Sequence, residues 1–420
     1  MTGPAADRAP SLARLCAVVL LPFSFGYFLS YLFRAVNAAL APDIVRDLGL
    51  GPSILGVLTA AYLLPFALFQ PVLGALLDRF GPRRVQAAML CVAALGGVLF
   101  SLGRDAVTLT AARALIGLGF SGGLMSSFKA IALWFPPERG PLAASMVSAI
   151  GGLGILMATR PADMLSQAMG WRFVFVALAG VVALAAIVIL LVVPERRGGA
   201  APATLRRHLS DLGLIYRDRL FWRLTPMICA TLGTYIAVQT LWVGGWLRDV
   251  AGYSREDAAW LMLTMAVGFS VGTLSMGVVA DRLLKRGVSV MATVFGTQAL
   301  YFLAQLGLVL QWIPAAPVLW IVFGTMGNVG VLTYPLLSQH FGQALAGRSN
   351  TSVNLLLFGV AFAIQSLIGV VVEFWAGGTG AATGQAFDSR GYQVAFGALL
   401  AAQLMSVAWY WYSGRRGAQT

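Results

Sequence analysis

Three basic side chains lie inside long apolar stretches of the sequence, and Arg34 is the one whose neighbours suggest chemistry. Tyr27, Tyr31 and Arg34 are spaced so that a helix places them on one face. An arginine within a membrane helix costs at least about 2.5 kcal/mol on insertion scales, so it needs a partner in protein, water or a ligand. No acidic residue lies deep in the apolar stretches of the first half, which favours an anionic ligand. The alternative is that Arg34 bonds to backbone carbonyls and stabilises the fold.

Other polar side chains in apolar surroundings extend this candidate site. Arg113 lies about two turns into its own apolar stretch, where a structural role and a ligand-binding role are equally supported. In the second half, the polar candidates are uncharged amide side chains, each isolated among apolar residues. Such amides supply either ligand contacts or hydrogen bonds between helices. The candidate binding residues are Tyr27, Tyr31, Arg34, Arg113, Gln239, Asn328 and Asn354.

The elements that must position these residues are transmembrane helices. The chain has 420 residues, of which 59% are hydrophobic and only 11% charged, far less charge than a soluble domain carries. Because about 20 apolar residues cross a bilayer as a helix, we predict an all-α membrane protein with twelve transmembrane helices. The predicted spans are 15–40, 53–77, 86–103, 107–134, 141–163, 172–193, 221–247, 257–280, 288–311, 315–338, 349–373 and 391–412.

Composition and motifs also exclude several classes of function. The net charge of +13 is spread over short loops between apolar runs, which indicates membrane topology rather than nucleic-acid binding. No Gly-rich loop ending in Gly-Lys-Ser or Gly-Lys-Thr is present, so an ATP-driven pump is not expected. The three cysteines lie far apart, which predicts neither a disulfide framework nor a metal site. We therefore expect no enzyme, no metal and no cofactor.

The distribution of basic residues predicts the orientation of the chain. With the amino terminus in the cytoplasm, the inner loops and ends carry 19 Lys and Arg, and the outer loops carry 7. This positive-inside bias predicts that both termini and the central linker are cytoplasmic. The predicted organisation is a tail at 1–14, a six-helix half at 15–193, a linker at 194–220, a second six-helix half at 221–413 and a tail at 414–420.

A short motif occurs twice, each time where an apolar stretch ends in a basic loop. The first copy begins Gly-Ala-Leu-Leu-Asp-Arg at Gly74, and the second begins Gly-Val-Val-Ala-Asp-Arg at Gly277. An internal repeat of this length indicates two homologous halves around a central pathway. Gly74 would let its helix approach a neighbour closely, and Asp78 could accept from the amino-terminal amides of another helix. The expected conformational latch comprises Gly74, Asp78, Arg79, Arg83, Asp281 and Arg282.

Twelve spans, a cytoplasmic linker and the duplicated Gly-x-x-x-Asp-Arg loop resemble the major facilitator superfamily over residues 15–413. The run Arg113-x-x-x-Gly117-x-Gly119 fits the same family. The resemblance implies that Asp78 contacts the start of span eleven, near Ser349, and that this contact holds the inner side closed. It also implies that spans seven and ten line the cavity, which places Gln239 and Asn328 there.

The first span, Gly26-Tyr27-x-x-x-Tyr31-Leu32-x-Arg34, resembles the organophosphate:phosphate antiporters. In that family the matching arginine binds phosphate together with a second arginine from span seven. The corresponding stretch here, residues 233–240, contains no arginine. A monoanion such as a carboxylate therefore fits a single arginine better than a phosphate ester does.

These features predict a secondary transporter that moves a small organic solute, an anion in preference to a cation, across the bacterial inner membrane by alternating access. The expected partners are the solute, membrane lipids, and a coupling proton or counter-anion, with the protein a monomer. Glu373 and His340, each at a helix end, are the candidate proton carriers. One alternative is a proton-driven drug or metabolite exporter, which usually has a carboxylate in its cavity. A second is a membrane receptor on a transporter-like scaffold.

Overall fold

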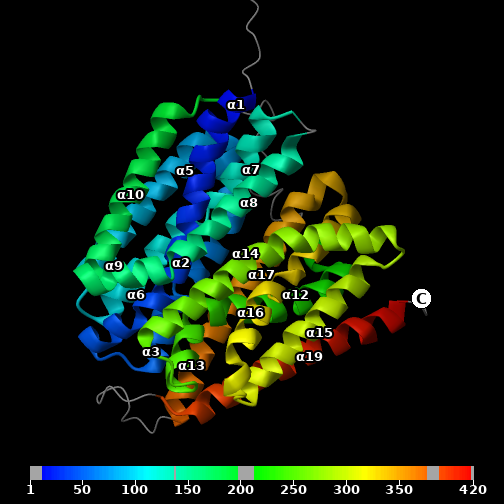
Figure 1. The fold of residues 1–420 in the computed structure, drawn as a ribbon. Coiled ribbons are helices and arrows are strands. Elements are labelled where there is room, and N and C mark those ends of the chain that lie inside the picture. Colours follow the sequence, from blue (N-terminus) through cyan, green and yellow to red (C-terminus); the bar gives the residue numbers. More distant parts are fainter. Residues whose placement is uncertain (1–11, 137–138, 197–211, 376–386, 418–420) are drawn as a thin grey trace, which may run out of the picture.

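The computed structural model describes residues 12–136, 139–196, 212–375 and 387–417, and the regular elements in these ranges are helices (Figure 1). The first half, coloured blue to green at the upper left, comprises α1 (Leu12–Leu15), η1 (Cys16–Leu20), α2 (Leu21–Leu48), α3 (Pro52–Ala60), α4 (Leu63–Leu68), α5 (Gln70–Leu102), α6 (Ala106–Phe120), α7 (Gly123–Trp134), α8 (Gly140–Met157), α9 (Arg160–Met169) and α10 (Trp171–Val192). The second half, green to red at the lower right, comprises α12 (Arg219–Ala237), η3 (Val238–Trp242), α13 (Val243–Asp249), α14 (Arg255–Lys285), α15 (Val290–Val309), η4 (Ile313–Ala315), α16 (Ala316–Met326), η5 (Val329–Thr333), α17 (Tyr334–Trp375) and α19 (Ser389–Gly417). Residues 197–211 of the predicted linker lie outside the described ranges.

The described helices account for the twelve predicted apolar segments. Nine are long and apolar enough to cross a membrane, and the pair α8 and α9, bent by 41°, makes a tenth. The other two predicted spans contain the shorter apolar helices Pro52–Leu68 and Ile313–Met326. These spans continue into α5 and α17, where Gly81 and Gly342 break the helical path with φ values of 79° and 68°. Glycine suits both positions because left-handed backbone is unfavourable for a residue with a Cβ.

Glycines also set the distance between α2 and α8. A Cβ on Gly151 would lie 2.6 Å from the ring of Tyr27, and one on Gly154 would overlap the main-chain carbonyl of Phe28. The cluster of small residues in α8 therefore allows the two helices to pack closely. This packing holds the face of α2 that carries Tyr27 against α8.

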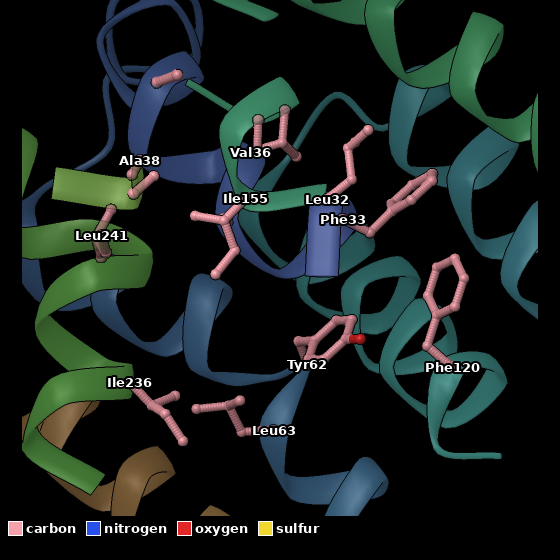
Figure 2. Packing of buried hydrophobic residues seen from close by; sticks show 14 of the residues in the cluster. Leu32, Phe33, Val36, Ala38, Tyr62, Leu63, Phe120, Ile155, Ile236 and Leu241 are labelled. Carbon is pink, nitrogen blue, oxygen red and sulfur yellow. The ribbon is translucent and has the colours of Figure 1, made fainter. Parts of the chain in front are cut away.

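The apolar core is continuous between the two halves. The main cluster of buried residues includes Ala38 and Leu63 of the first half together with Ile236 and Leu241 of the second. Figure 2 shows Ile236 beside Leu63, and Leu241 beside Ala38. The two halves thus form one packed body around α2, which carries Tyr27, Tyr31 and Arg34, and the α12–η3 segment, which carries Gln239.

Candidate functional site

Arg34 lies on α2 with the two tyrosines that were predicted to share its face. Its guanidinium carbon is 4.0 Å from the centre of the Tyr31 ring. The Tyr27 hydroxyl donates to the Tyr31 hydroxyl at 3.3 Å, and all three side chains are half-buried. From the other half, the ring centre of Phe358 on α17 is 6.0 Å from the same guanidinium. The site therefore combines one cation with aromatic rings from both halves.

The Arg34 guanidinium has no acidic partner in the described part of the chain. No described carboxylate oxygen lies within the 4.0 Å that defines a salt bridge, although the side chain is at lipid depth. Its positive charge is stabilised by the face of the Tyr31 ring, an interaction worth about 0.5–2 kcal/mol. An aromatic ring solvates a cation but does not neutralise it. The site retains a net positive charge that an anion can bind.

Arg113 supports α2 rather than facing the accessible space around Arg34. Its side chain is 0% exposed, and Nη2 donates to the main-chain carbonyl of Arg34 at 3.3 Å. The ring of Tyr62 lies 5.2 Å away, while Nε and Nη1 have no hydrogen-bond partner. In this conformation Arg113 acts on the backbone of α2, and the ligand contact predicted for it is not open.

The predicted amides of the second half separate into two groups. Gln239 lies in the π-helical turn η3 and lines a pocket with three alanines of α2. Asn328 instead donates to Thr273 at 3.1 Å, and Asn354 accepts from Tyr334 at 2.8 Å. The last two contacts lie within the second half. The structure thus brings Gln239 to the helix that carries Arg34. Asn328 instead contacts α14, and Asn354 joins the two parts of α17 on either side of the kink at Gly342.

The sequence analysis missed a tyrosine in span seven. Tyr235 of α12 is buried, and its hydroxyl has no hydrogen-bond partner. Its ring stacks on Phe269 with centroids 5.1 Å apart and planes at 5°. The sequence did contain a signal for this residue: Tyr235 is the one tyrosine in residues 233–240, the stretch that was compared for a second arginine.

A network of ion pairs joins the two halves where α2 ends and α14 begins. This is the outer end of the molecule in the predicted orientation. Arg255 of α14 donates to both carboxylate oxygens of Asp43 on α2, at 2.7 and 2.6 Å. Its Nε also donates to Asp163 of α9 at 2.7 Å. The Ser166 hydroxyl adds a hydrogen bond to Asp43 at 2.6 Å. We call Asp43, Asp163 and Arg255 the outer network.

Two further contacts join the halves at the same end. Arg160 of α9 pairs with Glu256 of α14 at 2.6 Å. The amide of Ser53 at the start of α3 donates to Glu373 at 3.0 Å. Glu373 therefore stabilises a helix amino terminus in the other half, where a negative charge is favourable. This contact gives the residue a structural role in place of the proton-carrier role considered from sequence.

The motif predicted as an inner latch makes a different contact from the one expected. Asp78 accepts from Lys129 of α7, in its own half, at 2.7 Å. A Cβ on Gly74 would meet no atom within 4 Å, so the close helix approach expected there is absent from this conformation. The guanidinium of Arg79 is exposed and lies 5.1 Å from the Phe80 ring. The inner part of α5 is not packed against a neighbour at Gly74 in this conformation, so the close approach at this position stays a prediction.

The structure describes the side chains of only some of the other latch residues. Arg83 donates to the carbonyl of Leu190 and approaches Glu195 at 3.8 Å, which ties α5 to the end of α10. Arg282 is exposed at the end of α14. The side chain of Asp281 lies outside the described residues. These observations leave the mechanical role of the second motif a prediction.

His340, the second candidate proton carrier, pairs with Asp218 at the start of α12 at 2.9 Å. Burial raises the pKa of Asp218, but hydrogen bonds from His340 and the Phe221 amide outweigh this effect and lower the pKa below its usual value. His340 therefore contributes to a helix-terminal pair at the surface, away from the Arg34 site.

The family of this chain follows from its sequence as a whole. The family model "Major Facilitator Superfamily" matches residues 23–366, more than half of the chain. The chain belongs to this superfamily. The family match and the long apolar helices make it a multi-pass membrane protein. The narrower resemblance of span one to the organophosphate:phosphate antiporters is not confirmed.

Curated relatives of this superfamily member are distant. The chain is 24% identical over 274 residues to the "Probable sulfoacetate transporter SauU" of Cupriavidus necator, covering 62% of this chain and 64% of the relative. It is 27% identical over 292 residues to the "Probable galactarate/D-glucarate transporter GudP" of Bacillus subtilis, with the same shares of each chain. The matches span just under two thirds of these relatives.

Solved structures agree with the fold of the superfamily. A bacterial homolog of the human lysosomal transporter Spinster, in an inward-facing and occupied conformation, matches with a TM-score of 0.78 and 18% identity. That match covers 97% of this chain and 98% of the other. A mutant of the nucleoside transporter NupG matches with a TM-score of 0.71 and 12% identity, over 94% of this chain and 99% of the other. At these identities the likeness concerns the fold.

Proposed function

We propose that this transporter carries a small organic anion across the bacterial inner membrane by alternating access, with Arg34 as the anion-binding residue. The observation that carries the proposal is the guanidinium of Arg34, half-buried in the middle of α2 with no described carboxylate within 4.0 Å. A cation at lipid depth without an acidic partner is unfavourable unless a ligand or water completes its environment. A carboxylate or sulfonate matches the planar fork of an arginine.

The names of two relatives support the choice of an anion. One is named for sulfoacetate and the other for galactarate and D-glucarate, all of which are organic acids. Each relative is under 30% identical to this chain, so the names suggest a chemical class rather than a compound. The drug-exporter alternative has no comparable support around Arg34, because that residue gives the site a positive charge that repels cations.

The contacts between the halves support transport by alternating access. The outer network and the contact of Glu373 with α3 hold the halves together at the outer end. Asp78 is meanwhile paired within its own half. We propose that, when the outer contacts break, the inner ends approach and Asp78 exchanges Lys129 for the amino terminus of the helix near Ser349. Gly74 would then have a neighbouring helix against it.

The test measures binding to purified wild-type protein and to two variants at Arg34. A panel of organic anions and cations would be screened by the rise in melting temperature that a ligand of the folded state produces. Arg34→Ala removes one charge-assisted contact and should weaken binding of the best anion about 10- to 150-fold, which corresponds to about 1.5–3 kcal/mol. Arg34→Lys keeps the charge but loses the fork, so its affinity should be intermediate.

The control is Arg104→Ala, which removes an exposed arginine in the loop before α6. This variant should bind the anion as the wild type does, and all proteins should elute as monodisperse species. Normal binding or transport by Arg34→Ala would contradict the proposal. A cation as the only ligand of the panel would instead favour the drug-exporter alternative.

The predicted orientation is tested separately from the substrate. Reporter fusions near residue 200 and at the carboxyl terminus should both report cytoplasm in a bacterial host, as the positive-inside bias requires. A periplasmic signal from either fusion would contradict the assignment of the inner and outer ends.

A further inference from the structure

One arginine at the outer end of the second half has no partner among the described residues. Arg248 is the penultimate residue of α13, and its side chain makes no hydrogen bond, ion pair or ring contact with them. It is half-buried, and its guanidinium nitrogens are not fully enclosed, in contrast to Nε and Nη1 of Arg113. The adjacent Asp249 accepts from the Tyr392 hydroxyl at 2.7 Å. Arg248 therefore presents a positive charge that a small anion can reach.

A half-buried arginine without a partner is the exception at this end of the described structure. Arg46, Arg160 and Arg255 each pair with a carboxylate at 3.3 Å or less. An arginine that faces lipid needs no such partner, because its side chain can extend to the headgroups. The span Arg219–Asp249, which ends beside Arg248, is instead enclosed by protein, since 94% of its most apolar stretch is buried. A membrane anchor therefore does not explain this arginine.

The guanidinium of Arg248 lies where the two halves meet. A Cβ on Gly244, one turn earlier on α13, would be 3.2 Å from Nη1 of Arg248. The same Cβ would be 3.1 Å from the main-chain oxygen of Ala38 on α2, and 3.4 Å from the sulfur of Met262 on α14. These atoms surround one point, and a glycine at position 244 leaves that point open. Nη1 therefore faces α2 of the first half without a side chain between them.

The two wall residues on α2 and α14 also connect Arg248 to the cavity that Gln239 lines. That cavity continues along α2 as far as Ala35, which follows Arg34 in the chain. All of its lining side chains are uncharged, and in this conformation it has room for about one water molecule. An uncharged cavity thus lies on α2 between two arginines that lack acidic partners. It is closed to a solute while the outer network holds the halves together.

We propose that Arg248 is an outer anion site, at which a carboxylate or sulfonate binds on its way between the outside and Arg34. The inference rests on the proposed function, because it takes Arg34 as the inner site. It adds a second binding site, on the second half, at the outer mouth of the path. A free guanidinium there raises the local concentration of anions and repels cations. When the outer network breaks, the anion can leave Arg248 for the cavity.

The first experiment follows the chemical modification of Arg248 itself. p-Hydroxyphenylglyoxal reacts with accessible arginines, and mass spectrometry of the digested protein gives the rate at each position. The probes are sulfoacetate, galactarate and D-glucarate, the acids for which two relatives are named. At least one acid should slow modification of Arg248 about threefold or more, because the bound anion covers the guanidinium. Choline chloride at the same ionic strength should not. The same protection is expected in Arg34→Ala, since the outer site does not depend on Arg34.

The internal control for the modification is Arg390, an exposed arginine at the start of α19. Its rate should be the same with and without the acids. Unchanged modification of Arg248 with all three acids would overturn the outer site. Protection that disappears in Arg34→Ala would overturn it as well, because the acids would then act on Arg248 only through the inner site. The Arg34 proposal is judged separately, by binding to Arg34→Ala.

The second experiment separates arrival at the outer end from the later steps of transport. For uptake of the protecting acid from outside, Arg248→Gln should raise KM about three- to tenfold, with the maximal rate within about twofold of wild type. Arg248→Lys keeps the charge and should retain most of the wild-type KM. The KM of wild type should rise more steeply with salt than that of Arg248→Gln, because salt screens the charge that the variant lacks. Arg390→Gln is the control and should behave as wild type. Equal KM values for wild type and Arg248→Gln at low salt would contradict the proposal.

Discussion

The outer and inner ends of the molecule differ in how their charged residues are paired. At the outer end, Arg255 of the second half contacts Asp43 and Asp163 of the first. At the inner end, Asp78 pairs with Lys129, and both residues belong to the first half. The repeated sequence motif is thus at the end where the described contact does not cross between halves. The contacts that hold this conformation come instead from residues that no motif marks.

The ion pairs at the two ends differ in how far their side chains are buried. The Asp163 and Asp43 side chains are 1% and 8% exposed, whereas Asp78 and Lys129 are each 31% exposed. An exposed pair contributes about 0–1 kcal/mol, while removing one partner of a buried pair costs about 3–5 kcal/mol. Removing one partner of the outer network is therefore costly, whereas the Asp78 pair can exchange partners at little cost.

The largest effect is expected from breaking the outer network. Arg255→Gln removes the cation that Asp43 and Asp163 share and leaves them only their pairs with Arg46 and Arg160, which should destabilise the outward-closed conformation by up to about 3–5 kcal/mol. A single cysteine at Ala39, one turn before Asp43 on α2, would report the change in a background without the three native cysteines. Labelling of this position by a membrane-impermeant maleimide from outside should rise.

The control for this variant is Arg46→Gln. Arg46 also contacts Asp43, at 3.1 Å, but its side chain is 80% exposed. Its removal should change labelling little, because a solvated pair contributes about 0–1 kcal/mol. Equal labelling of wild type and Arg255→Gln would show that the buried network does not determine which end is closed.

An intermediate effect is expected from the glycine packing at the same end. A Cβ on Gly369 of α17 would lie 2.5 Å from the main-chain oxygen of Pro52, so Gly369→Ala should push α3 and α17 apart. Overpacking of this kind costs about 1–3 kcal/mol and should increase outer labelling. Gly359→Ala on the same helix is the control, since a Cβ there meets nothing within 4 Å. Identical labelling of the two variants would refute the role of this close approach.

The smallest effect on stability, with a clear effect on transport, is expected at the inner end. Asp78→Asn removes a partly exposed ion pair, so the free energy of unfolding should fall by less than about 1 kcal/mol. The melting temperature should therefore fall only slightly. The variant should nevertheless favour the inward-open conformation and transport more slowly, because the proposed latch with the helix near Ser349 is weakened. Cysteine accessibility on the inner face and uptake into vesicles measure the two effects. Unchanged accessibility and unchanged rate would leave Asp78 without a mechanical role.

Much of the fold could be predicted because each helix crosses the membrane as an apolar segment of sufficient length. The second and tenth spans were least accurate, because each is divided into shorter helices, α3 and α4 in one and α16 and η5 in the other, before the chain enters α5 and α17. The face shared by Tyr27, Tyr31 and Arg34 was also confirmed, because helical spacing fixes it locally. The spacing of residues within one helix does not predict which residues of another helix will lie opposite them.

Hydropathy, helical periodicity and the repeated motif by themselves determined the membrane fold, the superfamily and the position of Arg34 on its helix. Only the tertiary structure decided that Arg113 supports the backbone of Arg34, and that Phe358 of the second half lies 6.0 Å from the Arg34 guanidinium. It also decided that Asp43 meets Arg255, which is 212 positions away. The reason is physical: hydropathy and helical spacing are local properties of the chain, whereas these contacts depend on how two separately formed halves pack against each other.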